Sequence, residues 1–338
     1  MHVDNEKTYQ ERLRRYVTAL NNRKPDRVPI RPFAAEFTGR HAGYTCQQLT
    51  QSYEDAFAAM LKCCQDYDWD AVPASMVYVW SGITDAAGVK YYGVPGINMS
   101  PEFGFQYREP PEESAFMRAD EYDRLIDDPT AFLYEVWLPR ASSRIQPVGE
   151  PVTFKHNVAL TSAAMAVTQY FNAFGPQCAR LRREAGMPGA MAGIFKAPLD
   201  IIGDKMRGYI GLTMDMIEQP EKVKRACEAL MPHLFWVANS TADPCSQLPV
   251  GYWMHRGCVP FVRPETFNEV YWPTVRPIIE ELWKNKHQTM FYAEGNWDYH
   301  LDAFRELPER SIIYHIDRGD PQLAHQKLHD KFALRRVC

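Results

Sequence analysis

The chain has 338 residues, of which 46% are hydrophobic and 24% are charged, a composition typical of globular proteins. The net charge is −4, and the basic residues form no cluster, so nucleic acid and anionic membranes are not expected partners. No apolar run approaches the ~18 residues of a membrane span, and the charged N-terminus does not resemble a signal peptide. The eight cysteines contain no Cys-x-x-Cys pair, which favours a reduced cytoplasmic protein of enzyme size.

Short β-branched or aromatic runs alternate along the chain with amphipathic stretches. The first 26 residues are expected to hold an N-terminal helix, and apolar residues at helical spacing predict further helices over 48–67, 220–240 and 264–285. The segment 95–150 is rich in proline and acid and is expected to be an excursion, with a small helix over 119–128. The predicted strands cover residues 27–33, 71–79, 151–159, 190–198, 249–257, 288–296 and 311–317.

Strands that alternate with helices imply a parallel sheet joined by right-handed crossovers. Seven such units favour a closed (β/α)8 barrel, formed by residues 1–338 as one domain, over an open sheet. The absence of a Gly-x-Gly-x-x-Gly turn after an early strand argues against dinucleotide binding.

In such barrels the chemistry lies at the carboxyl ends of the strands. The residues there are more polar than a folding core requires. Each also has an ordinary structural explanation, such as a helix cap for the acid, a hydrogen-bonded core position for a histidine or a salt bridge for the lysine. The candidates at the predicted strand ends are Tyr78, Trp80, His156, Asn157, Lys196, His255, Glu294 and His315.

Several longer motifs, taken together, point to a known family. NRKPDRVPI, FTGRHAGYT and CCQDYDWDAV occur near the N-terminus, and APLDIIGDKMRGYIGLTMDMIEQPEKV in mid-chain. RPETFNEVYWPTVRPIIEEL and DRGDPQLAHQKLHDKFAL follow. In this order, over residues 8–334, they resemble the uroporphyrinogen decarboxylase superfamily, and the resemblance implies the same (β/α)8 barrel.

The branches of that superfamily differ at a few positions. The Arg-Gln-Ala-Gly-Arg-Tyr stretch of the decarboxylases is missing, and YAEGN (292–296) stands where methyltransferases that act on thiols have His-x-Cys-Gly-Asn. What remains resembles methyltransferases of anaerobic O-demethylation, some of which hold zinc with Glu-x14-Glu-x20-His. Glu294 and His315 have the x20 spacing, whereas Glu280 precedes Glu294 by thirteen intervening residues, one fewer than the pattern.

The resemblance implies a zinc-dependent methyltransferase that moves the methyl group of a small phenyl methyl ether, or of a similar methyl donor, to the cob(I)amide of a separate corrinoid protein. Zinc on Glu294, His315 and Glu280 would stabilise the departing oxygen as a Lewis acid. The chain has no Asp-x-His-x-x-Gly motif, so the corrinoid is expected on a partner protein. The residues expected to hold the aromatic substrate are Tyr78, Trp80, Phe195, Trp253, His156, Asn157, Lys196 and His255.

Three alternatives stay open from the sequence. One is a uroporphyrinogen decarboxylase-like enzyme, another a methylcobamide:thiol methyltransferase, and the third a degenerate, non-catalytic barrel. The third arises because members of the superfamily continue beyond KFAL, whereas this chain ends at RRVC, so strand eight is expected to be cut short or completed by a partner chain. The oligomeric state is not indicated.

Overall fold

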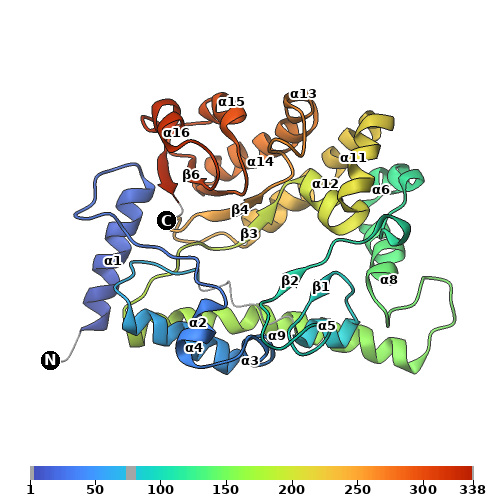
Figure 1. Ribbon diagram of the computed structural model, residues 1–338, viewed down its shortest axis with the longest axis horizontal. Helices are drawn as coiled ribbons and strands as arrows, with labels where there is room; N and C mark the ends of the chain where they lie inside the picture. The colour runs from blue at the N-terminus through green and yellow to red at the C-terminus, as the bar shows by residue number, and fades with distance from the viewer. Residues whose placement is uncertain (1–3, 74–80, 337–338) are drawn as a thin grey trace. The chain divides into compact units, whose positions relative to one another are not determined.

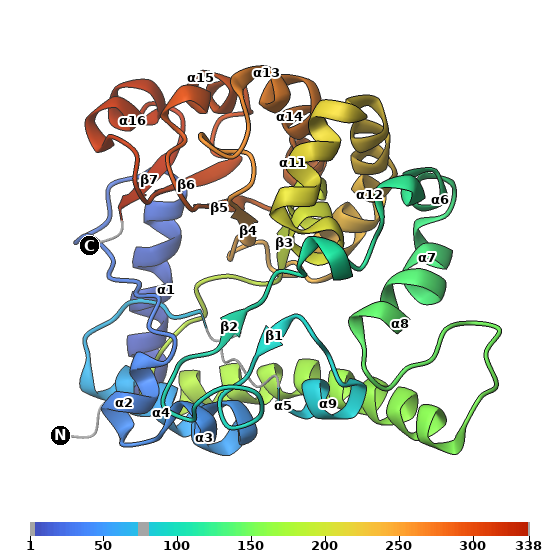
Figure 2. The ribbon, with the colours of Figure 1, turned by 45° about the vertical axis from the view of Figure 1, so that its right-hand side comes forward.

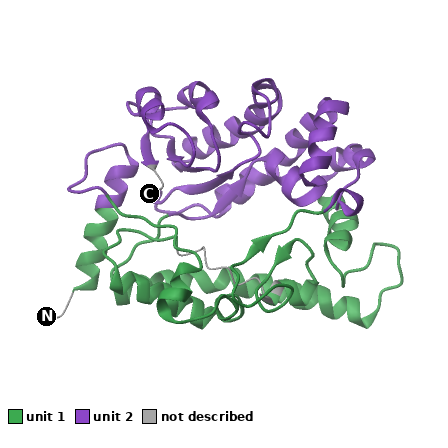
Figure 3. Cartoon of the chain, viewed as in Figure 1, with its two compact units in different colours: residues 1–14, 29–110, 130–190 green, residues 15–28, 111–129, 191–338 purple. Residues whose placement is uncertain are grey.

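The computed structural model describes residues 4–73 and 81–336. The chain divides into two compact units, which are coloured separately in Figure 3. Unit 1 comprises residues 1–14, 29–110 and 130–190, and unit 2 comprises residues 15–28, 111–129 and 191–338. Helix α1 (Asn5–Leu20) confirms the predicted N-terminal helix and contributes residues to both units.

Unit 1 is mainly helical. The predicted helix over 48–67 is confirmed as α3 and α4, which are separated at Ser52, because the Ser52 hydroxyl accepts the Asp55 amide and caps α4. Helix α4 packs on α9 through a cluster that includes Phe57 and Tyr170. The elements of unit 1 are α2 (Phe37–Ala42), α3 (Cys46–Gln51), α4 (Tyr53–Asp66), α5 (Ser81–Ala87), β1 (Tyr92–Gly93), β2 (Gln106–Tyr107), α7 (Pro129–Phe132), α8 (Leu138–Ala141) and α9 (Phe154–Ala185).

The strand predicted over 151–159 is wrong, because this segment begins α9. Val152, Phe154 and Val158 fall on one side of an alternating pattern, which is typical of a strand. Thr153, however, has extended backbone angles and its hydroxyl accepts the His156 amide at 3.2 Å, which caps the helix. His156 and Asn157 therefore lie in the first turn of a helix and not at the end of a strand.

The strand predicted over 27–33 does not form either. Pro29 and Pro32 have no amide hydrogen to donate to a ladder. Instead, Ile30 forms two hydrogen bonds with Asp70. The Ile30 carbonyl oxygen accepts from the Asp70 amide at 2.7 Å, and the Ile30 amide donates to the Asp70 carboxylate at 2.7 Å. In the predicted strand 71–79, Val72 forms a single bridge with Gly189, and residues 74–79 lie outside the described residues.

Unit 2 contains a five-stranded parallel sheet in which the strands follow one another in chain order. The predicted strands 249–257, 288–296 and 311–317 are confirmed, and 190–198 is confirmed over a shorter length. The beginning of a further strand after 332 is also present and pairs with β6. The strands are β3 (Ile194–Lys196), β4 (Val250–Met254), β5 (Thr289–Ala293), β6 (Ile312–Ile316) and β7 (Ala333–Arg336).

The helices of unit 2 connect these strands, and α14, α15 and α16 lie on one side of them in both views of the ribbon (Figures 1 and 2). The predicted helices over 220–240 and 264–285 are confirmed, the second with a π-helical turn at Phe267–Tyr271 between its two parts. The helices are α6 (Tyr122–Asp127), α10 (Pro198–Ile201), α11 (Gly208–Glu218), α12 (Pro220–Ser240), α13 (Pro264–Thr266), α14 (Trp272–Lys284), α15 (Leu301–Arg305) and α16 (Pro321–Leu328).

The segment 95–150 has little regular structure beyond β2 and short helices, and α6 confirms the small helix expected within 119–128. Its other turns are 3-10 helices at Glu112–Ser114 and Ala119–Glu121 and a π-helical turn at Leu133–Trp137. Two further short helical turns are the π-helical turn Ile202–Arg207 and the 3-10 helix Asp298–His300. A parallel sheet with connecting helices confirms the mixed α/β class, while closure into a barrel stays a prediction.

Candidate active site at the carboxyl edge of the sheet

Two rows of side chains cross unit 2's sheet, one on each face. Phe195, Tyr252, Phe291 and Tyr314 are in register on neighbouring strands and are buried, with successive ring centroids 4.7, 5.4 and 6.5 Å apart. Because side chains alternate along a strand, the next residue of each strand faces the opposite side. That opposite row is Lys196, Trp253, Tyr292 and His315.

Three of the residues predicted from the sequence, Lys196, Trp253 and His315, thus share one face. The Trp253 and Tyr292 rings are stacked with centroids 4.2 Å apart, and the Tyr292 and His315 rings form a T-shaped pair with centroids 5.2 Å apart. Phe195 belongs to the opposite, buried row, so it is not placed beside Trp253 as a wall for a substrate ring.

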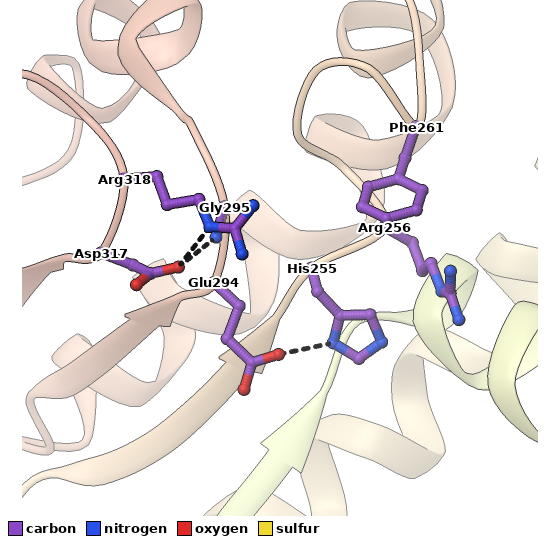
Figure 4. Close-up of a pocket in the computed structure, with 7 residues that line it drawn as sticks. All are labelled: His255, Arg256, Phe261, Glu294, Gly295, Asp317 and Arg318. Carbon is purple, nitrogen blue, oxygen red and sulfur yellow. Dashed lines mark hydrogen bonds and ion pairs between the residues drawn. The ribbon is translucent and has the colours of Figure 1, made fainter. Parts of the chain in front are cut away.

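A pocket of about 390 Å³ lies at the carboxyl ends of β4, β5 and β6. Figure 4 shows that its polar side chains come from the residues that directly follow these strands. His255 and Glu294, both predicted from the sequence, stand two residues beyond Trp253 and Tyr292 and face each other, with Nδ1 of His255 3.8 Å from Oε2 of Glu294. The full lining is His255, Arg256, Phe261, Glu294, Gly295, Asp317 and Arg318.

The His255 ring is held by Asp204, a carboxylate that is almost fully buried. Nε2 of His255 lies 3.0 Å from Oδ1 of Asp204, Nε of Arg256 donates to the same oxygen at 3.0 Å, and the Lys196 ammonium pairs with the other oxygen. Burial alone would raise the pKa of Asp204, but the hydrogen bond from His255 and the charge of Lys196 outweigh burial and lower it. Asp204 is therefore an anion that binds the side chains of His255, Arg256 and Lys196.

The same surroundings favour the protonated form of His255. Burial lowers its pKa, but the nearby charge of Asp200 and the hydrogen bond to Asp204 outweigh burial, so the pKa is raised above its ordinary value. Because Nε2 faces the Asp204 carboxylate, the Nδ1 side of the ring is the one directed to Glu294. The surroundings of His255 therefore favour the imidazolium form of a ring that lines the pocket.

A second buried carboxylate, Asp200, lies behind the first. It accepts the backbone amide of Arg256 at 2.7 Å and the hydroxyl of Tyr271 at 3.2 Å, and the Tyr271 hydroxyl is 2.7 Å from that of Tyr252. Complete burial raises the pKa of Asp200. By binding the amide that follows His255, Asp200 fixes the turn at the end of β4.

Glu294 and Asp317 shape the opposite wall. The Glu294 carboxylate, about half exposed, accepts the indole N–H of Trp253 at 3.0 Å. Asp317 accepts the amide of Gly295 at 2.8 Å, and Gly295 has a φ of 95°, a conformation that favours glycine. The chain turns at Gly295, just after the end of β5, and the Glu294 side chain lines the pocket.

The predicted zinc ligands fit the metal only in part. Glu294 and His315 supply an oxygen and a nitrogen donor, which zinc accepts, from neighbouring strands. His315 is, however, in register with Tyr292, two residues before Glu294. Glu280 lies on α14, where it accepts a hydrogen bond from Arg276 at 2.7 Å. Over residues 4–73 and 81–336, no three histidine, cysteine, aspartate or glutamate side chains are grouped to hold a metal. We therefore derive no catalytic step through zinc.

Four further residues were predicted from the sequence. Tyr78 and Trp80 lie outside the described residues. His156 and Asn157 belong to unit 1, where Nδ1 of His156 accepts the amide of Gln146 at 2.9 Å.

Sequence reasoning missed Asp200, Asp204, Arg256, Asp317 and Arg318. A signal for the first two was present, because the acids of DIIGD are four residues apart directly after a strand and share one helical face.

The chain matches no model of a known protein family, and no curated protein matches it. Within the part of the chain that the structure describes, no helix is long and apolar enough to span a membrane.

Proposed function

We propose that this chain is a methyltransferase that takes the methyl group of a small phenyl methyl ether and passes it to the corrinoid of a separate protein. The observation that carries the proposal is the Asp204–His255–Glu294 arrangement at the carboxyl edge of the parallel sheet. It supplies a proton donor where α/β enzymes place their chemistry. The choice of an ether as substrate rests on the resemblance to O-demethylation methyltransferases.

An aryl ether needs help at its oxygen, because phenoxide is a poor leaving group. When bound, the reduced corrinoid of the partner supplies the electron pair that takes the methyl carbon. As the bond from methyl carbon to oxygen breaks, its electron pair stays on the oxygen, and Nδ1 of His255 donates its proton there, so that a neutral phenol leaves. The raised pKa of His255 keeps this proton available near neutral pH.

Other groups in the pocket suit the same substrate. The pocket volume lies within the range of sites for small molecules. The Phe261 ring lines the pocket, and the Arg256 guanidinium lies over it at 5.1 Å from the ring centroid, which makes a flat, partly apolar wall. Glu294, 3.8 Å from the imidazole, stabilises its charge before the proton moves. Zinc on Glu294 and His315 stays a separate prediction.

The test is methyl transfer from a panel of phenyl methyl ethers to cob(I)alamin, followed by the spectral change to methylcobalamin. We expect turnover with at least one ether and a loss of about 10²- to 10⁴-fold in the His255→Gln variant, the size of a general-acid contribution. His233→Gln, at an exposed position of α12, is the matched control. Methyl transfer to a thiol alone would indicate a methylcobamide:thiol methyltransferase. Decarboxylation of a porphyrinogen would indicate a uroporphyrinogen decarboxylase-like enzyme. Absence of any turnover would favour a non-catalytic barrel.

A further inference from the structure

A pair of histidines outside the pocket has the form of a metal chelate. His325 lies in α16 and His329 follows as the residue that ends this helix, so the two are four residues apart and share one face. Both are exposed, and their rings are stacked, with centroids 4.4 Å apart and planes inclined by 28°. Two imidazoles this close on one helical face can direct nitrogen atoms at a single ion.

The hydrogen bonding of His329 prepares one of those nitrogens. Nδ1 of His329 lies 2.6 Å from the carbonyl oxygen of His325. A carbonyl oxygen only accepts, so Nδ1 carries the proton, and in the neutral ring Nε2 then has the lone pair that a metal ion requires. Histidines that bind metals commonly donate their other ring nitrogen in this way, which fixes the tautomer and the ring.

The neighbouring carboxylates are occupied by cations. Asp330 forms two bonds with the Arg305 guanidinium, at 2.6 and 2.7 Å, and Asp302 accepts the Lys327 ammonium at 2.6 Å. These carboxylates would be the oxygen ligands that magnesium and calcium require. The chemistry of the pair therefore selects an ion that prefers imidazole, such as Ni²⁺, Cu²⁺ or Zn²⁺.

We propose that His325 and His329 together bind one divalent transition-metal ion at the surface of unit 2, with water at the remaining positions. The site is distinct from the predicted Glu294–His315 pair and does not depend on the proposed methyl transfer. Because the ion bridges two residues of one helical turn, it also holds the carboxyl end of α16 in its helical form.

The test uses the full chain, stripped with a chelator and titrated with Ni²⁺ in a calorimeter. Ni²⁺ is chosen because Cu²⁺ oxidises thiols and Zn²⁺ binds them, and Cys178 and Cys245 are exposed. A Glu294→Ala background removes the other predicted pair. We expect one binding event whose affinity falls by at least about tenfold in His325→Gln and in His329→Gln, since even loss of an outer partner costs this much. His233→Gln, a lone exposed histidine, should leave the affinity unchanged.

A second measurement distinguishes the loss of metal binding from a loss of fold stability in the variants. An ion that binds only the folded chain raises its melting temperature. Ni²⁺ should raise the melting temperature of the parent and of His233→Gln, and should not raise that of the two α16 variants. Binding with the parent's affinity in His325→Gln or His329→Gln, or no binding in the parent, would overturn the proposal.

Discussion

His300 is a histidine that its surroundings keep neutral. It is buried, and its ring is stacked on Phe267 at a centroid distance of 3.7 Å. Burial lowers its pKa to about 4, below the ordinary value of 6.5. Between these values the unfolded chain binds more protons than the folded one, so the contribution of His300 to stability is present above pH 6.5 and is lost as the pH falls to about 4.

This linkage can be measured in a variant that keeps the stacked ring. In His300→Phe we expect the free energy of unfolding to fall less steeply between pH 6.5 and 4 than in the parent, because the titrating group is gone. Urea unfolding at a series of pH values gives the slope, and His233→Gln serves as the control. Equal slopes in His300→Phe and the parent would mean that His300 binds its proton equally well in the folded and the unfolded chain, so that burial does not lower its pKa.

The zinc prediction is also decided at the level of single residues. Two protein ligands hold zinc more weakly than the three of most catalytic sites. We expect purified protein to carry at most about one zinc ion at Glu294 and His315, and a chelator to remove it. Elemental analysis should show less zinc in Glu294→Ala and in His315→Ala. The comparison is made in a His325→Gln/His329→Gln background, so that the surface pair does not contribute. Zinc that neither substitution lowers would contradict the assignment.

Among the elements, α14 is a helix whose apolar residues, placed at helical spacing in the sequence, form one buried face. Val275, Ile278, Ile279 and Leu282 repeat at helical spacing, and all four are buried. We expect Ile279→Ala to lower the free energy of unfolding by about 2–5 kcal/mol, because the cavity it leaves is fully enclosed. Glu281→Ala is the control at a partly exposed position of the same helix, where loss of its solvent-screened pair with Lys284 should change the free energy of unfolding far less. Chemical denaturation measures both, and similar losses would show that Ile279 does not lie in a packed core.

The strands predicted correctly and incorrectly differ in what the sequence can encode. The central runs around Tyr252, Phe291 and Tyr314 consist largely of apolar residues and are bounded by turns, a pattern typical of parallel strands. In 151–159 the alternation of apolar residues suits a strand equally well, and the outcome depended on Thr153, whose hydroxyl caps a helix. In 27–33 the two prolines outweighed β-branched residues.

The candidate site was predictable to the extent that it follows strand ends. His255 and Glu294 were found because they come directly after confirmed strands. The pairing of His255 with Asp204 joins residues 51 positions apart, and no local pattern encodes such a contact. The offset between Glu294 and His315 depends on strand register, which the spacing of two residues along the chain does not determine.

At the scale of the molecule, unit 2 is assembled from separate stretches of chain, and a buried ion pair in the stretch that begins at 191 also bonds to the stretch 111–129. Arg207 donates to the Asp215 carboxylate at 3.1 Å and to the carbonyl oxygen of Met117 at 2.9 Å. The Tyr122 hydroxyl donates to Asp215 at 2.8 Å, so this ion pair contacts the segment 111–129 at two points, Met117 and Tyr122. Asp215 and Arg207 are both buried.

Removing the carboxylate should therefore loosen the segment 111–129 before the rest of unit 2. In Asp215→Ala, Arg207 is left as a buried charge without its carboxylate, and we expect a loss of about 3–5 kcal/mol. Tyr122→Phe removes one hydrogen bond to a charged group and should cost about 1.5–3 kcal/mol. Hydrogen exchange read by mass spectrometry should show faster exchange over 111–129 in both variants, with β4, β5 and β6 still protected in Tyr122→Phe. If the sheet and this segment lost protection together in Tyr122→Phe, the two stretches would unfold as one cooperative body, and the ion pair would hold the core of unit 2 as well as its edge.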